Sequence, residues 1–121
     1  MPRPNLEHAI KKGVLTPAHV ATFLGITAPT VRKMVEKQQL RCARKPPSGE
    51  ISFTAIDLIH DIRRLPGFAD QPLHPRLLMA AVFYVSRRAA EGTPIPIEAI
   101  PPEVIVEQAR LTQLLASKQS A

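Results

Sequence analysis

The chain has 121 residues but only one cysteine, no tryptophan and 4% aromatic residues. One cysteine cannot form an intramolecular disulfide, so nothing indicates an oxidising compartment, and we expect a cytoplasmic protein. The four histidines are scattered, and His19 is expected at the surface. No cysteine joins them at the spacing of a zinc site, so we expect no metal.

Long apolar runs and catalytic signatures are also missing. The longest apolar run, from 77 to 85, is far shorter than the roughly 20 residues that a helix needs to cross a bilayer, so we expect no membrane partner. The sequence contains no glycine-rich phosphate loop, nucleophile elbow or acid–base set. We therefore expect neither an enzyme nor a cofactor, and no small-molecule effector is indicated.

Basic residues, by contrast, are abundant and unevenly distributed. The chain carries 16 Lys and Arg against 10 Asp and Glu, which gives a net charge of +6. Residues 1–65 hold eleven basic and five acidic residues, whereas residues 66–121 hold five of each. The whole net charge therefore lies in the first half, which favours a polyanionic partner for that half.

Two helices joined by a short turn are predicted within the basic half. Thr16 is a good cap for a helix over 17–24, because its hydroxyl can accept a hydrogen bond from a free helix amide and proline follows it. Gly25 suits the left-handed end of that helix. Thr27 can then cap a second helix over 28–38. The outward side of this second helix is expected to carry Thr30, Arg32, Lys33, Glu36 and Lys37.

Further elements flank this pair of helices. Asn5 can cap a short first helix that runs to Lys12. Two short alternating runs, 40–45 and 50–54, are joined by a Pro-Pro-Ser-Gly loop and predict a β-hairpin. A third amphipathic helix is predicted over 54–65. Its solvent-facing side is expected to hold Asp57, His60, Asp61 and Arg64, paired with one another as ions.

The second half of the chain predicts a helical extension. A helix over 75–90 is apolar nearly all round between 77 and 85, so it needs burial on more than one side. A Pro-rich connector leads to a last helix over 102–117 with a broad apolar stripe. Both helices supply more apolar surface than a small core requires, so we expect a homodimer, with completion of the core as the alternative. The residues expected in dimerisation are Leu77, Leu78, Val82, Phe83, Leu111 and Leu114.

Three segments of the first half resemble a known family. The run LTPAHVATFLGITAPTVRKMV at 15–35, then QLRCAR at 39–44 and ISFTAIDL at 51–58, resembles the winged helix-turn-helix of MerR-type regulators and phage excisionases. The resemblance implies that the second helix enters the major groove, that the hairpin acts as a wing along the adjacent backbone or minor groove, and that dimers or tandem copies bind repeated half-sites.

The expected fold class is therefore mainly α with a small β-hairpin: a winged helix-turn-helix over 1–68 and a C-terminal helical extension over 69–121. The N-terminal turns of a docked recognition helix face the base edges, and the planar fork of Arg32 matches the two acceptors of guanine. The base-reading candidates are Thr27, Ala28, Thr30, Arg32 and Lys33. The candidates for phosphate contact and for the wing are Lys37, Arg41, Arg44, Lys45 and Ser48.

These residues favour a transcriptional regulator, specifically a repressor, that binds double-stranded DNA in a sequence-specific way. Two alternatives remain open at the level of sequence. One is an excisionase-like architectural factor that bends DNA. The other is a winged-helix interaction module that binds no DNA, in which the basic run is only a solvated helix face.

Overall fold

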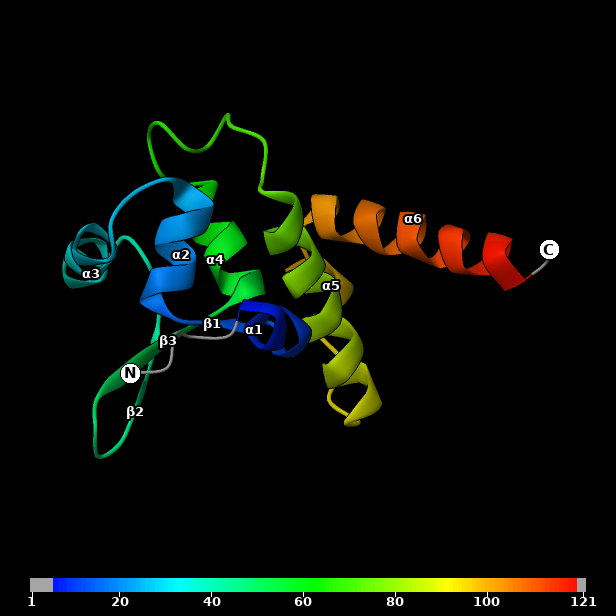
Figure 1. Ribbon diagram of the computed structural model, residues 1–121, viewed down its shortest axis with the longest axis horizontal. Helices are drawn as coiled ribbons and strands as arrows, with labels where there is room; N and C mark the ends of the chain where they lie inside the picture. Colours follow the sequence, from blue (N-terminus) through cyan, green and yellow to red (C-terminus); the bar gives the residue numbers. More distant parts are fainter. Residues whose placement is uncertain (1–5, 120–121) are drawn as a thin grey trace.

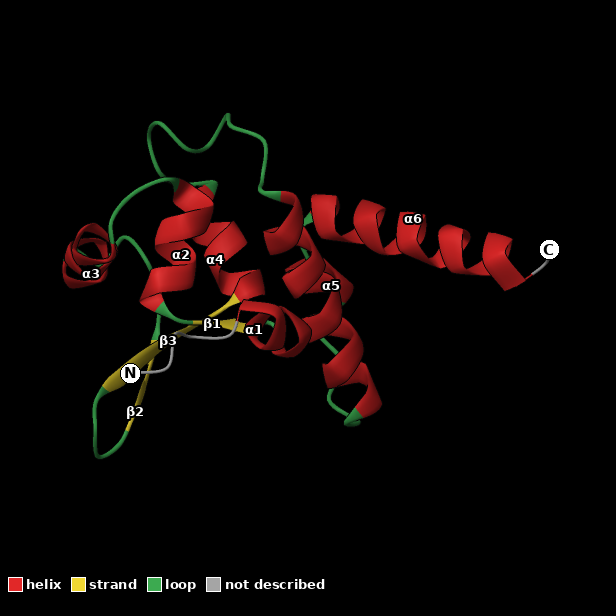
Figure 2. Cartoon of the chain, viewed as in Figure 1, coloured by secondary structure: helices red, strands yellow, loops and turns green. Residues whose placement is uncertain are grey.

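The computed structural model describes residues 6–119, in which helices predominate over three short strands (Figure 2). In chain order the elements are α1 Leu6–Lys12, β1 Val14–Leu15, α2 Pro17–Leu24, α3 Ala28–Glu36, β2 Ala43–Lys45, β3 Glu50–Thr54, α4 Ala55–Ile62, α5 Pro75–Ala90, the 3-10 helix η1 Ile97–Ala99 and α6 Pro102–Gln119. This order confirms the expected class, mainly α with a small β element and a C-terminal helical extension. Asn5, the expected cap of α1, lies outside the described residues.

Local hydrogen bonds fix the helix–turn–helix formed by α2 and α3. The Thr16 hydroxyl accepts a hydrogen bond from the His19 N–H at 3.3 Å, and the His19 ring accepts one from the Thr16 N–H at 3.2 Å. This reciprocal cap turns the imidazole back over the start of α2, so His19 is buried rather than at the surface as expected. Gly25 ends α2 in the left-handed conformation, with φ of 70°. Thr27 then caps α3 by accepting a hydrogen bond from the Thr30 N–H at 3.3 Å.

Helix α3 rests on the rest of the molecule by a narrow strip. Val31 is its one fully buried side chain, and Met34 and Val35 are half-buried. The helix ends at Glu36, two residues before the predicted end, and Gln38 takes a left-handed φ of 62° in the turn that follows. Figure 1 shows α3 at one end of the molecule, with α2 beside it on the inner side. Its remaining faces are therefore turned away from the core.

The predicted hairpin is present but belongs to a larger sheet. Strands β2 and β3 pair antiparallel, with Ala43 opposite Ser52. Strand β3 also pairs with β1, where Leu15 lies opposite Phe53, so the strand order is β1-β3-β2. The sequence did not predict β1, because two residues carry no detectable alternation. The first hairpin strand begins at Ala43 rather than at residue 40, since Leu40 is buried in the core instead.

A single hydrophobic core joins the two halves of the chain. It includes Phe53 of β3, Leu58 of α4, Leu77 of α5 and Val104 of α6, all with almost no exposed surface. Helix α5 packs against both α1 and α4. One side of α5 therefore completes the core, which is the alternative that the sequence left open. Leu77 was expected in dimerisation, but it is buried within this core.

Gly13 allows α5 to approach the first helix closely. Its φ is +71°, and a Cβ at this position would lie 2.8 Å from the Ala80 carbonyl oxygen and 3.0 Å from the Tyr84 Cα. Any side chain here would collide with the backbone of α5. The Gly13 carbonyl also accepts a hydrogen bond from the Ala55 N–H at 2.9 Å. One residue thus connects α1, the start of α4 and α5.

Helix α6 begins against the core and then leaves it. Val104 is fully buried, and Glu103 forms an ion pair with Arg63 beyond the end of α4. Partial burial raises the pKa of Glu103, but a backbone hydrogen bond, Arg63 and His60 together lower it, so the pKa lies below its usual value. Figure 1 shows the rest of α6 projecting from the body at the end opposite α3. No helix within residues 6–119 has both the length and the apolar character needed to cross a bilayer.

Candidate nucleic-acid interface

The outward side of α3 carries basic side chains without carboxylate partners. Arg32, Lys33 and Lys37 are all exposed, in agreement with the sequence. Among the described residues, none of the three takes part in an ion pair. Glu36, the one acidic residue of the helix, is exposed as well. The charge of the three basic groups is therefore free to act on a ligand, and phosphate is the group that suits it.

The start of α3 is occupied by its own cap. The hydroxyls of Thr27 and Thr30 lie 2.8 Å apart, and Thr27 also accepts the Thr30 N–H. Both side chains are exposed, whereas Ala28 is half-buried. Because the Thr27 hydroxyl already serves the helix, its remaining capacity for an outside contact is smaller than that of Arg32 or Lys33. The sequence-based set thus extends from the cap, Thr27, to Lys33 in the last turn of α3, and its members are not equally available.

The hairpin adds a second, smaller group of polar side chains. Arg44 of β2 is exposed and has no ion-pair partner within the part of the chain that the structure covers. Ser48 in the loop is exposed, and its hydroxyl accepts a hydrogen bond from the Glu50 N–H at 3.3 Å. The backbone of Lys45 belongs to β2, but its side chain lies outside the described part. In Figure 1 the hairpin extends from the same end of the molecule as α3.

Arg41 occupies a different position from the other basic candidates. Its Nε lies 3.1 Å from Oδ1 of Asp61, and its backbone N–H donates to Oδ2 of the same carboxylate at 2.8 Å. Asp57 is a weaker neighbour, with 3.7 Å between its Oδ1 and the Arg41 guanidinium. Arg41 was expected to contact phosphate, but its charge is committed to α4 within the protein. It holds the start of the hairpin segment against that helix.

The burial of Asp61 corrects a second expectation. Asp61 was placed on the solvent side of its helix and paired there, but only 5% of its side chain is exposed, against 54% for Arg41. A buried carboxylate requires donors, and Arg41 supplies two of them from a segment 20 residues away. The sequence did contain a signal, because Asp61 follows the buried Leu58 by three positions and so shares its face of the helix.

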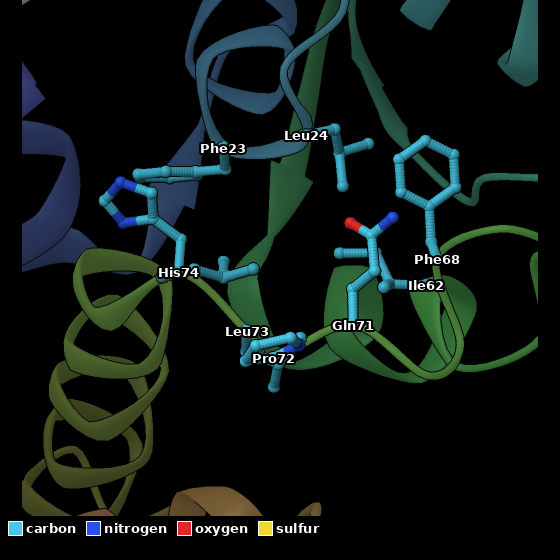
Figure 3. A pocket seen from close by; sticks show the side chains of 9 residues that line it. Phe23, Leu24, Ile62, Phe68, Gln71, Pro72, Leu73 and His74 are labelled. Atoms are coloured by element: carbon cyan, nitrogen blue, oxygen red, sulfur yellow. The ribbon is translucent and has the colours of Figure 1, made fainter.

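A small cavity lies behind the helix–turn–helix, between the end of α2 and the loop that leads to α5 (Figure 3). The rings of Phe23 and His74 line it, with their centroids 5.0 Å apart. Its volume is about 30 Å³. That is room for a water molecule, whereas pockets for small-molecule ligands measure roughly 300 Å³ or more. This cavity is therefore a packing feature and does not suit a metabolite.

Neither a metal cluster nor a known relative adds to this picture. Residues 6–119 contain no group of three or more His, Cys, Asp or Glu side chains placed to hold a metal ion. Cys42 is a half-buried free thiol. Comparisons with protein-family models, with curated proteins and with solved structures give no match for this chain. The geometry of α3 and of the hairpin is therefore the basis for assigning a function.

Proposed function

We propose that the chain is a sequence-specific DNA-binding regulator of transcription, in which α3 reads the major groove and the β2–β3 hairpin acts as the wing. The observation that carries this proposal is the outward face of α3. Arg32, Lys33 and Lys37 lie there, exposed and unpaired among the described residues, on a helix whose one fully buried residue is Val31. Such a density of uncompensated charge on a weakly buried helix favours a polyanion as its counterpart.

The dimensions of α3 suit the groove. With its side chains an α-helix is about 10 to 12 Å across, and this diameter is what has to enter the groove. The major groove is about 12 Å wide and admits one α-helix. Of the exposed groups on α3, Arg32 is the one that can donate two parallel hydrogen bonds to a single base, so we assign it to a guanine. Lys33 joins it in base reading, while Lys37 and Arg44 contact phosphates on either side.

The test begins with selection of bound sites from random duplex DNA, using the full chain. Arg32→Ala should then relax the base preference at one position and weaken binding to the selected site roughly 10- to 100-fold. Lys37→Ala should weaken binding to all sequences alike and reduce the slope of log affinity against log salt by about 0.9. Arg88→Ala is the matched control, because Arg88 is a half-exposed arginine in the last turn of α5, away from α3, and it forms no ion pair among the described residues. It should leave both quantities nearly unchanged.

Two results would overturn this assignment. One is equal weakening by Arg32→Ala and Arg88→Ala, which would mean that α3 makes no special contact. The other is a chain that binds no duplex even at low ionic strength, as expected for an interaction module without DNA binding. Footprints separate the remaining alternatives: a repressor should protect a discrete site with repeated half-sites. An excisionase-like factor should protect a phased array and bend the DNA.

A further inference from the structure

An apolar groove lies between α5 and α6, on the part of the molecule farthest from α3. Its volume is about 440 Å³, and none of the residues that line it is charged. Its apolar lining consists of Met79, Val82, Phe83, Leu111, Leu114 and Leu115. Of these, Phe83 is 40% exposed, Leu114 is 47% exposed and Leu115 is 61% exposed. Apolar side chains gathered in this way are typical of a contact surface.

Helix α6 forms one wall of the groove in its own chain, and α6 of a second copy is a segment of the right kind to fill it. Helix α6 projects from the body in Figure 1, so most of its length is open to a partner. From Leu111 to Ser117 its sequence contains no charged residue, although the chain as a whole carries +6. Just before this segment, Glu107 and Arg110 form an ion pair with each other and neutralise their charges. The segment of α6 from Leu111 to Ser117 is therefore uncharged, like the groove, and the next charged residue along the helix is Lys118.

We propose that this surface binds a second copy of the chain, with α6 of each copy lying in the α5–α6 groove of the other about a two-fold axis. In a two-fold contact each patch meets its own duplicate, so any net charge on it would repel itself. An uncharged patch on a strongly basic chain is what such a contact requires. A different protein as partner would not require this surface to be uncharged. Acidic groups on that protein would be better matched by basic groups on this surface.

The area of contact also favours two copies over a single foreign helix. The segment 105–117 is about 20 Å long and about 10 Å wide, so one helix in one groove buries on the order of 400 Å² over both partners. A two-fold pair makes the α6–α5 part of this contact twice and the α6–α6 part once, so it buries on the order of 600 Å² before the flanking residues are added. Stable interfaces bury at least about 1,000 Å² in total. A second copy therefore comes closer to that size than a single foreign helix does.

The sequence predicted dimerisation through six residues, and four of them, Val82, Phe83, Leu111 and Leu114, line this groove. The other two do not. Leu77 belongs to the core, and Leu78 is half-buried outside the groove. Met79 and Leu115 line the groove, and neither was among the expected residues. Self-association through this surface does not depend on DNA binding, because α3 lies at the other end of the molecule. Each proposal can therefore fail without the other.

The test measures the mass of the full chain in solution by sedimentation, without DNA. The wild type should sediment as a dimer. The double variant Leu114→Glu/Leu115→Glu should dissociate into monomers at the same concentration, with affinity weakened at least about 100-fold, because each buried charge is introduced twice in a two-fold contact. Val106→Glu is the matched control. Val106 is 69% exposed on the same helix but does not line the groove, so its variant should remain a dimer.

Circular dichroism should show that both variants keep the wild-type helix content, because the replaced residues are exposed. A second measurement avoids mutation altogether: hydrogen exchange along α6 should slow as the concentration of the wild type rises. A wild type that remains monomeric at about 100 µM would overturn the proposal, since that corresponds to an association too weak for a specific dimer. Equal dissociation of the Val106→Glu variant, or a dimer that survives the double substitution, would also overturn it.

Discussion

Replacement of Arg41 by alanine separates two roles that this basic residue could serve. If Arg41 contacts phosphate, its loss should weaken DNA binding and leave the fold intact. In the structure its guanidinium is paired with the buried Asp61 instead, with Nε 3.1 Å from Oδ1. The loss of Arg41 should therefore act mainly on the stability of the fold. The comparison with Arg44, an exposed arginine two residues past Cys42, makes this testable.

The expected magnitude follows from which member of the pair is buried. Removal of one partner from a buried ion pair costs about 3 to 5 kcal/mol when the remaining charge is left uncompensated. Asp61 would remain buried, but it would keep the backbone N–H of residue 41 at 2.8 Å, and the arginine is itself half-exposed. We therefore expect Arg41→Ala to lower the free energy of unfolding by about 2 to 3 kcal/mol. Arg44→Ala should change it by less than about 0.5 kcal/mol, as is usual for an exposed residue.

The assay combines urea denaturation with DNA affinity measured over a series of salt concentrations. Arg41→Ala should leave the slope of log affinity against log salt unchanged at a temperature where it is folded. Arg44→Ala should reduce that slope by about 0.9. Adding Asp61→Asn to Arg41→Ala should recover part of the lost stability, because the buried charge is then removed as well. An Arg41→Ala variant that is as stable as the wild type and has the reduced slope would refute this reasoning.

Two further substitutions test the packing of the extension. Gly13→Ala should lower the free energy of unfolding by about 3 kcal/mol, because its methyl group overlaps the α5 backbone and the alanine is strained in the left-handed conformation. Gly25→Ala is the control: it has the same strain without the overlap and should cost about 1 kcal/mol. If thermal unfolding shows the same loss of stability in both variants, the α5 backbone does not lie in close contact with residue 13. A backbone hydrogen bond and the ion pair with Arg63 lower the pKa of Glu103 in the folded chain, so the charged carboxylate should stabilise the fold at neutral pH and lose that effect as the pH falls below the usual pKa of a glutamate. The stability difference between wild type and Glu103→Gln, below about 1 kcal/mol, should therefore vanish in acid; a difference that persists there would mean that the ion pair is not its source.

The sequence predicted best those elements whose ends are set by neighbouring residues. Thr16 and Thr27 each mark the start of a helix because the hydroxyl bonds to an amide three positions later, and both starts are confirmed. The limits of α5 were also predicted, from the proline at its start and the change of composition at its end. The end of α3 was not, because the left-handed turn at Gln38 involves no glycine or proline.

Features that depend on distant segments could not be predicted in this way. Helical spacing places Asp61 on the same face as Leu58, but the partner that satisfies its buried carboxylate lies 20 residues earlier, and no local pattern identifies that partner. The apolar surface of α5 required burial, but the sequence could not say whether a second copy or α1 and α4 would provide it. The basic face of α3 was predictable, since exposure of Arg32 and Lys33 follows from helical periodicity alone. Their partner is not encoded in that pattern.

The two proposals assign DNA binding to one end of the molecule and self-association to the other. The end with α3 and the hairpin is basic and weakly buried, and the groove between α5 and α6 at the other end is lined by uncharged, mostly apolar residues. A dimer formed through α6 keeps both copies of α3 exposed, at the far ends of the pair. Both copies of α3 can meet the same face of a duplex only if their half-sites are separated by whole turns of DNA, each roughly 34 Å. A selected site whose half-sites are out of phase with the helical repeat would therefore mean that the two proposals cannot both hold.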